Sequence, residues 1–128
     1  MTATELGARY RAYIACLNAQ DWPQLGNFVH EHVVHNGRQI GLAGYNDMLM
    51  GNFAEIPDLR FDIRLLLSNP PHVASILSFD CRPRGTFLGL PVNGRRVAFA
   101  EHVFYAFREG RIAEVWSVID KAAIELQL

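Results

Sequence analysis

The sequence predicts an α+β fold built on a mostly antiparallel sheet. Helical periodicity is confined to the part of the chain before Pro57, and the part after it reads as a series of strands. Helices and strands that are segregated along a chain favour this class over a doubly wound parallel sheet. The 128 residues, half of them hydrophobic, suffice for one core. We therefore expect residues 1–128 to form a single domain.

The first two helices are predicted from their starts. Thr2 and Glu5 have the spacing of a capping box, and apolar residues then recur at helical intervals, which predicts an amphipathic helix over about 4–19. Asp21 is a suitable cap for a second, shorter helix with a proline in its first turn. This second helix should end near His30.

The middle of the chain changes from helical to strand patterns. A short β-branched run over 32–36 precedes a third helix, which is expected over about 45–53. Residues 59–68 then alternate between apolar and polar, which predicts a strand. Residues 72–82 are apolar at both odd and even positions, which indicates a second strand whose two faces are both covered by other parts of the protein. The Gly- and Pro-rich segment 83–94 is longer than most connections, and we interpret it as a lid or a mobile rim.

Two closing strands lie within residues 95–120, and the tight turn between them decides which side chains share a face. A three-residue loop over 108–110, with the glycine in the left-handed conformation, pairs even-numbered residues with each other and places His102 opposite Trp116. A two-residue loop would instead place His102 on the opposite face from Asp120, because a one-residue slip moves every side chain to the other face.

We interpret the turn as the three-residue loop, and this gives the hairpin two distinct faces. One face suits the wall of a cavity, because it combines small residues with rings, an imidazole and carboxylates: Ala98, Ala100, His102, Phe104, Ala106, Glu114, Trp116 and Asp120. Helices on one side of the sheet cannot cover both faces, so the other face should be a subunit interface. We expect a homodimer through this outer sheet face, which carries Val97, Phe99, Val103, Tyr105, Phe107, Val115 and Ile119.

Composition argues against several classes of protein. The formal net charge of -1 lacks the basic footprint of a nucleic-acid binder. The N-terminal segment lacks the uninterrupted apolar core of a signal peptide, and no apolar run approaches membrane-spanning length. Cys16 and Cys81 show no metal-binding or redox spacing, so we interpret them as free buried thiols. We expect a soluble, cytoplasmic protein with no nucleic-acid or membrane partner.

Taken in order, these features resemble the SnoaL-like polyketide cyclase family, within the cone fold shared by nuclear transport factors, ketosteroid isomerase and scytalone dehydratase. The resemblance covers essentially the whole chain. It rests on the opening helix, the DW pair before the second helix, the His in VVHNG, the Gly before the third helix, and the closing segment EGRIAEVWSVID. It implies a curved sheet forming a cone-like half barrel, with three N-terminal helices closing a pocket, commonly as a dimer.

The resemblance also implies an intramolecular aldol closure without a cofactor, in which an aspartate at the end of the closing strand is the general acid/base. Asp120 matches that position, and His102 is placed on the position of an accompanying histidine. His35 matches a histidine that we interpret as pocket-lining. Independently of the family, a carboxylate beside apolar side chains would have a raised pKa that suits proton abstraction. The alternative is that Asp120 caps the segment 121–128.

The sequence thus predicts a cofactor-independent cyclase or isomerase-type enzyme acting on a small, largely apolar carbonyl compound. Asp120 and His102 are the catalytic candidates, and Trp116, His35, Phe104 and Glu114 are the ligand-binding candidates. No metal site is expected, because His30, His32 and His35 would not all share a strand face and no familiar ligand spacing joins them. Two alternatives stay open: a non-catalytic binding module, and an epoxide hydrolase or dehydratase that uses Asp80 and Arg82.

Overall fold

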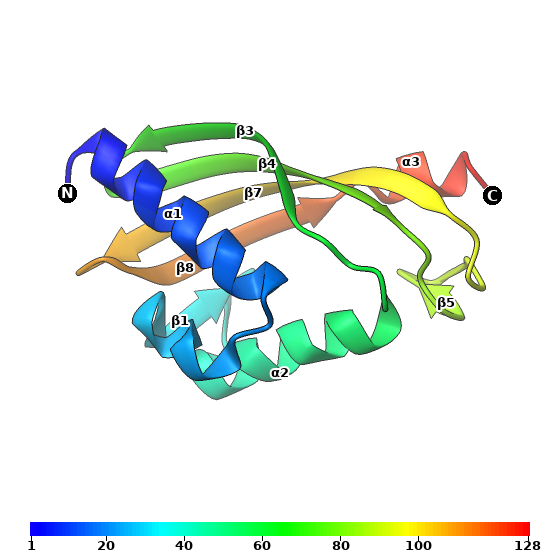
Figure 1. The fold of residues 1–128 in the computed structure, drawn as a ribbon, viewed down its shortest axis with the longest axis horizontal. Helices are drawn as coiled ribbons and strands as arrows, with labels where there is room; N and C mark the ends of the chain where they lie inside the picture. Colours follow the sequence, from blue (N-terminus) through cyan, green and yellow to red (C-terminus); the bar gives the residue numbers. More distant parts are fainter.

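The main element of the fold is a curved six-stranded sheet with strand order β2-β1-β8-β7-β4-β3 (Figure 1). The computed structural model describes every residue from 1 to 128. The strands are β1 (Val29–His35), β2 (Arg38–Gln39), β3 (Asp62–Asn69), β4 (His72–Cys81), β7 (Val97–Arg108) and β8 (Arg111–Ile119). All neighbours are antiparallel except β1 and β8, which run parallel. The predicted mostly antiparallel α+β class is confirmed, and the sheet is open rather than closed into a barrel.

Two long helices lie on the same side of the sheet, where they cover its inner face (Figure 1). Helix α1 (Ala3–Asn18) begins with the predicted capping box, since the side chains of Thr2 and Glu5 each accept a hydrogen bond from the other's backbone N–H. Helix α2 (Gly41–Glu55) is longer than the predicted third helix. None of the helices combines the length and the apolar character that crossing a membrane requires.

The second predicted helix is shorter than expected. It is a 3-10 helix, η1 (Trp22–Asn27), and the Asp21 side chain makes no capping hydrogen bond. Gly and Asn are poor helix formers, and the β-prone residues after them enter β1, where Val29 pairs with Ile112 of β8. The prediction that this helix extends to His30 is therefore wrong.

The Gly- and Pro-rich segment between β4 and β7 contains a small hairpin of its own. Strands β5 (Thr86–Phe87) and β6 (Leu90–Pro91) pair only with each other. Leu88 and Gly89 form the turn, and both have positive φ values of 52° and 78°. The hairpin lies at the same end of the molecule as the short C-terminal helix α3 (Lys121–Glu125), far from the N-terminus (Figure 1).

The hydrophobic core fills the space between the inner face of the sheet and the helices α1 and α2. On β7 the odd-numbered positions face this core, and Val97, Phe99, Val103, Tyr105 and Phe107 are all buried. The even-numbered positions of β7 face outward. This alternation decides which side chains of the closing hairpin can reach a ligand.

Candidate active site

A cavity of about 500 Å³ opens between the helices and the inner face of the sheet. Residues of α1, α2, β4, β7 and β8 form its walls, and the β5–β6 hairpin contributes Phe87 and Leu88. Of the 22 lining residues, 16 are hydrophobic, so the cavity suits a largely apolar small molecule. The few polar groups among them therefore determine what the site can do chemically.

Glu101 of β7 is the only carboxylate on the cavity wall. It occupies an odd-numbered, inward position among large apolar side chains. Burial raises the pKa of Glu101 above its ordinary value, and a hydrogen bond from the Ser117 hydroxyl to Oε2 partly opposes that rise. A carboxylate with a raised pKa in a mostly apolar cavity is suited to taking a proton from carbon and returning it.

Asn36 holds Ser117 in place beside Glu101. The Asn36 side chain accepts a hydrogen bond from the Ser117 backbone N–H at 2.8 Å and donates one to the Ser117 carbonyl at 3.1 Å. Asn36 and Gly37 form the turn between β1 and β2 with φ values of 47° and 80°, a conformation that these two residue types tolerate well. The parallel pairing of β1 with β8 brings this turn alongside Ser117.

Buried tyrosines line the wall of the cavity that is farthest from solvent. The hydroxyl oxygens of Tyr13 and Tyr45 lie 2.7 Å apart in a hydrogen bond, and Tyr105 lines the same region. Burial raises the pKa of all three phenols, so each stays protonated near neutral pH. In a hydroxyl pair one group donates to the other, and the accepting group keeps its own proton for a further acceptor.

His35 packs edge-on against this tyrosine pair. Its ring centroid lies 6.2 Å from that of Tyr45, and it also lines the cavity. Burial lowers the pKa of His35, so its imidazole is neutral near pH 7. The cavity thus holds a carboxylate, a neutral imidazole and protonated phenols on otherwise apolar walls.

Residues 8–128 match the family of SnoaL-like polyketide cyclases. The chain belongs to the SnoaL-like polyketide cyclase family. The resemblance inferred from the sequence is confirmed over nearly the whole chain. No curated protein matches it.

Several solved structures resemble this one closely. A SnoaL-like polyketide cyclase from Agrobacterium tumefaciens strain C58 is 53% identical, with coverage of 99% of this chain and 98% of that chain and a TM-score of 0.95. TsrD from Streptomyces laurentii is 19% identical, with coverage of 99% and 96% and a TM-score of 0.85. IdmH from Streptomyces antibioticus is 18% identical, with coverage of 95% and 96% and a TM-score of 0.82.

The turn of the closing hairpin in this SnoaL-like chain differs from the predicted one. Arg108 pairs with Arg111 across a two-residue turn of Glu109 and Gly110, so the three-residue loop is wrong. A bulge at Ala113 then shifts the register, and beyond it even-numbered residues do oppose even-numbered ones. His102 pairs with Val118 rather than with Trp116, which pairs with Phe104.

The predicted cavity face is in fact the outer face of the sheet. None of the even-numbered candidates lines the cavity: His102, Phe104, Glu114, Trp116 and Asp120. Phe104 is 57% exposed and Trp116 is 41% exposed. The physical reason is that the larger apolar side chains of β7 stand at odd positions, and burying them beneath the helices turns the even positions outward. His35, in contrast, lies in the cavity.

Asp120 is the N-cap of the C-terminal helix α3. Its Oδ1 accepts a hydrogen bond from the Ala123 backbone N–H at 3.1 Å, and the side chain is exposed. The alternative in which Asp120 caps the following segment therefore describes its position. The desolvated environment that was expected for this carboxylate surrounds Glu101 instead.

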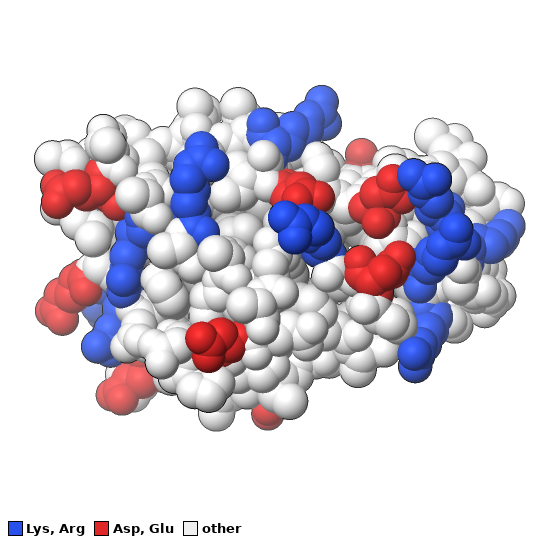
Figure 2. All heavy atoms as spheres, viewed as in Figure 1, with Lys and Arg blue, Asp and Glu red and all other residues white.

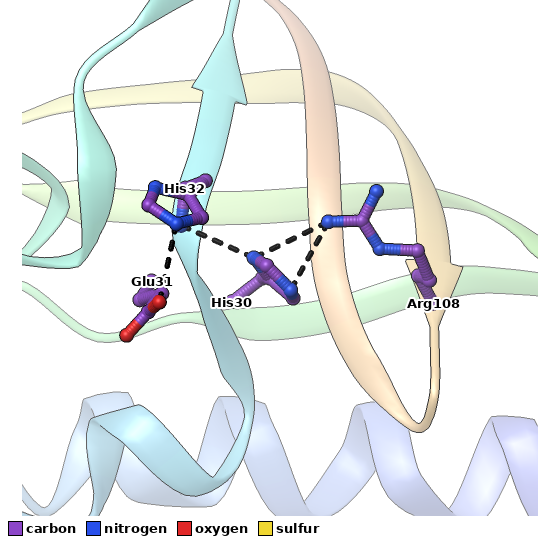
Figure 3. Close-up of polar contacts among 4 residues, drawn as sticks. All are labelled: His30, Glu31, His32 and Arg108. Carbon is purple, nitrogen blue, oxygen red and sulfur yellow. Dashed lines mark hydrogen bonds and ion pairs between the residues drawn. The ribbon is translucent and has the colours of Figure 1, made fainter.

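The three nearby histidines divide between two places. His30 and His32 lie on the outside of β1, where Nε2 of His30 is 3.0 Å from a guanidinium nitrogen of Arg108 and the His32 backbone N–H donates to Nδ1 of His30 (Figure 3). His32 also contacts Glu31 at 3.1 Å (Figure 3). His35 points away from them into the cavity. No three His, Cys, Asp or Glu side chains come together as a metal-binding group.

Asp80 and Arg82 do not face the cavity either. Both are exposed and neither lines the cavity, and the Asp80 carboxylate accepts two hydrogen bonds from the guanidinium of Arg96. This ion pair lowers the pKa of Asp80, which makes it a poor proton acceptor. The epoxide hydrolase or dehydratase alternative, which requires both groups in the cavity, is therefore wrong.

Proposed function

We propose that this family member is a cofactor-independent enzyme that removes a proton alpha to the carbonyl of a small, largely apolar ligand, with Glu101 as the general acid/base. One observation carries the proposal: the only carboxylate on the cavity wall is also the one whose pKa burial raises. Membership in a family of cyclases supports a carbon acid as the substrate.

The proposed step balances within the cavity. The Glu101 carboxylate takes the proton from carbon and becomes a carboxylic acid, while the carbonyl becomes an enolate. A phenol of the Tyr13–Tyr45 pair donates a hydrogen bond to the enolate oxygen, which stabilises the developing charge. The enolate carbon then attacks a second carbonyl in a cyclisation, or it is reprotonated in an isomerisation. Glu101 returns its proton to the product in either case.

Exchange of alpha protons for deuterium tests this step without knowledge of the natural substrate. We choose 1-tetralone in D₂O as the probe and follow the loss of its alpha-proton signal by NMR. The wild type should accelerate exchange, and Glu101→Gln should reduce that acceleration by at least about 100-fold. Thermal shift should show that Glu101→Gln still binds 1-tetralone.

Asp120→Asn is the matched control, because asparagine can still cap α3. This variant should exchange 1-tetralone at the wild-type rate. If Asp120→Asn loses exchange while Glu101→Gln keeps it, the general base is Asp120 and the assignment to Glu101 is wrong. If 1-tetralone binds but the wild type does not accelerate exchange, the cavity belongs to a non-catalytic binding module.

We also propose that the outer face of the sheet joins two copies of this chain. The residues predicted for that interface lie on the inner face instead, so that residue assignment is wrong for Val97, Phe99, Val103, Tyr105, Phe107, Val115 and Ile119. Two rows of side chains cross four strands on the outer face: Leu67, Ala74, Phe104 and Trp116 in one, and Leu65, Ile76, His102 and Val118 in the other. Val118 is 69% exposed and Leu67 is 59% exposed. Neither row contains a Lys, Arg, Asp or Glu side chain, so an identical apolar face is a better complement than a charged partner. The residues predicted for the site would then lie in the dimer interface.

The state of the two cysteines indicates the kind of cellular compartment in which the protein works. Cys16 and Cys81 are free and buried, and burial raises the pKa of the Cys81 thiol to about 11. Unreactive free thiols support our placement of the protein in the reducing cytoplasm.

A further inference from the structure

Lys121 is the only lysine in the chain and the only Lys or Arg residue that lines the cavity. The other eleven cationic side chains are arginines that lie elsewhere, and the salt bridges of the protein do not involve Lys121. The first position of a helix favours acidic rather than basic side chains, so α3 offers no local electrostatic reason for a lysine there. The ammonium of Lys121 is therefore the one cation of the cavity lining that is free to pair with a ligand.

Lys121 continues the row of inward positions along β8. Val115, Ser117, Ile119 and Lys121 are alternate residues, and all of them line the cavity. Ile119 pairs with Glu101, and Lys121 follows two residues later at the start of α3. The ammonium and the carboxylate belong to one cavity, and they do not form an ion pair.

The ammonium of Lys121 lies at the mouth of the cavity. A Cβ atom built at Gly89 would be 3.9 Å from Nζ of Lys121, so this side chain reaches from α3 to the turn of the β5–β6 hairpin. Leu88, in the same turn, lines the cavity and is exposed. Lys121 is exposed as well, whereas the tyrosines on the far wall are buried. The cavity thus has a carboxylate within it and a cation at its rim.

Further cationic side chains lie at the end of the molecule that carries the mouth of the cavity. Residues 82–100 contain four arginines and no acidic residue. Figure 2 shows Lys and Arg side chains gathered at the end of the molecule where β5 lies in Figure 1, with acidic side chains beside them. One of the four arginines, Arg96, is paired with Asp80. Acidic side chains lie beside these arginines, so Lys121, which lines the cavity itself, is the cation best placed to meet an anionic ligand.

We propose that the substrate is a keto acid with an aromatic or alicyclic body, whose carboxylate pairs with Lys121 at the mouth while its carbonyl lies inside near Glu101. The single cation matches a single negative charge, and the apolar walls match the body of such a molecule. The inference rests on the proposed function, because it names the substrate class of the same cavity.

Two probes that differ only in charge test this proposal: 6-acetyl-2-naphthoic acid and its methyl ester. Isothermal titration calorimetry should show that the wild type binds the acid more tightly than the ester, by about tenfold at low ionic strength. Added salt should reduce the preference. Lys121→Met should abolish the preference by weakening binding of the acid alone, and Lys121→Arg should retain most of it.

Arg11→Met is the control for net charge, because Arg11 lies on the exposed side of α1 and does not line the cavity. It should keep the wild-type preference. Equal binding of both probes by the wild type, binding of neither, or an unchanged preference in Lys121→Met would each overturn the proposal. Lys121 is exposed, so thermal unfolding of Lys121→Met should match that of the wild type.

A second measurement uses the unmutated chain. Reductive methylation with ¹³C-formaldehyde labels only the N-terminal amine and the single lysine, and it preserves the positive charge. The acid should shift the ¹³C signal of Lys121 and leave the N-terminal signal in place, and the ester should shift neither. A Lys121 signal that does not respond to the acid would contradict the pairing.

The proposed function can fail independently of this inference. Exchange of 1-tetralone, which carries no acid group, is measured on the wild type and tests Glu101 alone, whereas the preference for the acid is read from binding. Loss of the acid preference with normal exchange would remove only the keto-acid assignment. A Lys121-dependent preference in a protein that catalyses no exchange would leave a binding site for organic acids.

Discussion

The hydroxyl of Ser117 donates a hydrogen bond to the half-buried carboxylate of Glu101 across the β7–β8 pair. The two residues are diagonal neighbours, because Ser117 pairs with Val103 and Glu101 pairs with Ile119. Ser117 is itself held by Asn36 through its backbone N–H and carbonyl. The protonation of Glu101 is therefore set by two opposing contributions, burial and one hydrogen bond.

Removal of the hydroxyl in Ser117→Ala should raise the pKa of Glu101 further, because the hydrogen bond stabilises the ionised form. The acidic limb of the pH profile for 1-tetralone exchange should move to higher pH. NMR rates measured across the pH range check this. Ser117→Thr keeps a hydroxyl and should retain the wild-type profile. An identical profile for Ser117→Ala and the wild type would show that this hydrogen bond does not influence the base.

Relative to the wild type, the Glu101→Gln variant should become more stable as the pH rises from acid to neutral and alkaline values. The folded-state pKa of Glu101 is raised, so in the wild type the folded state holds a proton that the unfolded state has lost, and stability falls as pH rises through this window. The variant does not lose this stability, because its glutamine side chain does not titrate. Its free energy of unfolding in urea, minus that of the wild type, should therefore increase between about pH 4 and about pH 8.

Glu5→Gln is the opposite control for this measurement. The Thr2 backbone N–H and side chain lower the pKa of Glu5, so the wild type gains stability from this group as pH rises. The stability of the variant relative to the wild type should therefore fall over the same range. A stability difference for Glu101→Gln that does not change with pH would mean that Glu101 ionises as readily in the folded state as in the unfolded state.

Phe104→Glu should produce a monomer, because it places a charge in the centre of the proposed dimer interface. Sedimentation equilibrium should give a mass near 14.4 kDa for this variant and twice that value for the wild type. Met50→Glu changes an exposed apolar side chain on α2 and should remain dimeric. A wild type that sediments at 14.4 kDa would remove the dimer from the proposal.

Most of the fold could be predicted from the sequence because its signals are local. The capping box of Thr2 and Glu5 and the alternation of apolar and polar residues along 62–68 each determine their own element. The closing turn was harder, since one dipeptide, Glu109–Gly110, allows either loop length. The bulge at Ala113 lies several residues away and restores the parity that the shorter turn reverses.

The site was harder to predict than the fold, because the decisive question was which face of β7 lies inside. The odd positions carry Val97, Phe99, Val103, Tyr105 and Phe107, and Glu101 stands alone among them as a charged residue. A single carboxylate in such a series is the informative exception, since ionisable groups are rarely buried without a purpose. That signal was present in the sequence. The family resemblance points to Asp120 instead, which stands at an even-numbered position outside the cavity.

The β5–β6 hairpin pairs with no other strand, yet it supplies Phe87 and Leu88 to the cavity. The exposed residues of this hairpin can therefore be replaced while the register of β4 against β7 is kept, whereas Phe87 and Val92 belong to the core. For protein engineering this separates two properties that are usually linked, the choice of ligand and the ability to fold. A mutant library at Leu88 and its exposed neighbours in this hairpin would vary the mouth of the cavity and leave Glu101 on β7 in place.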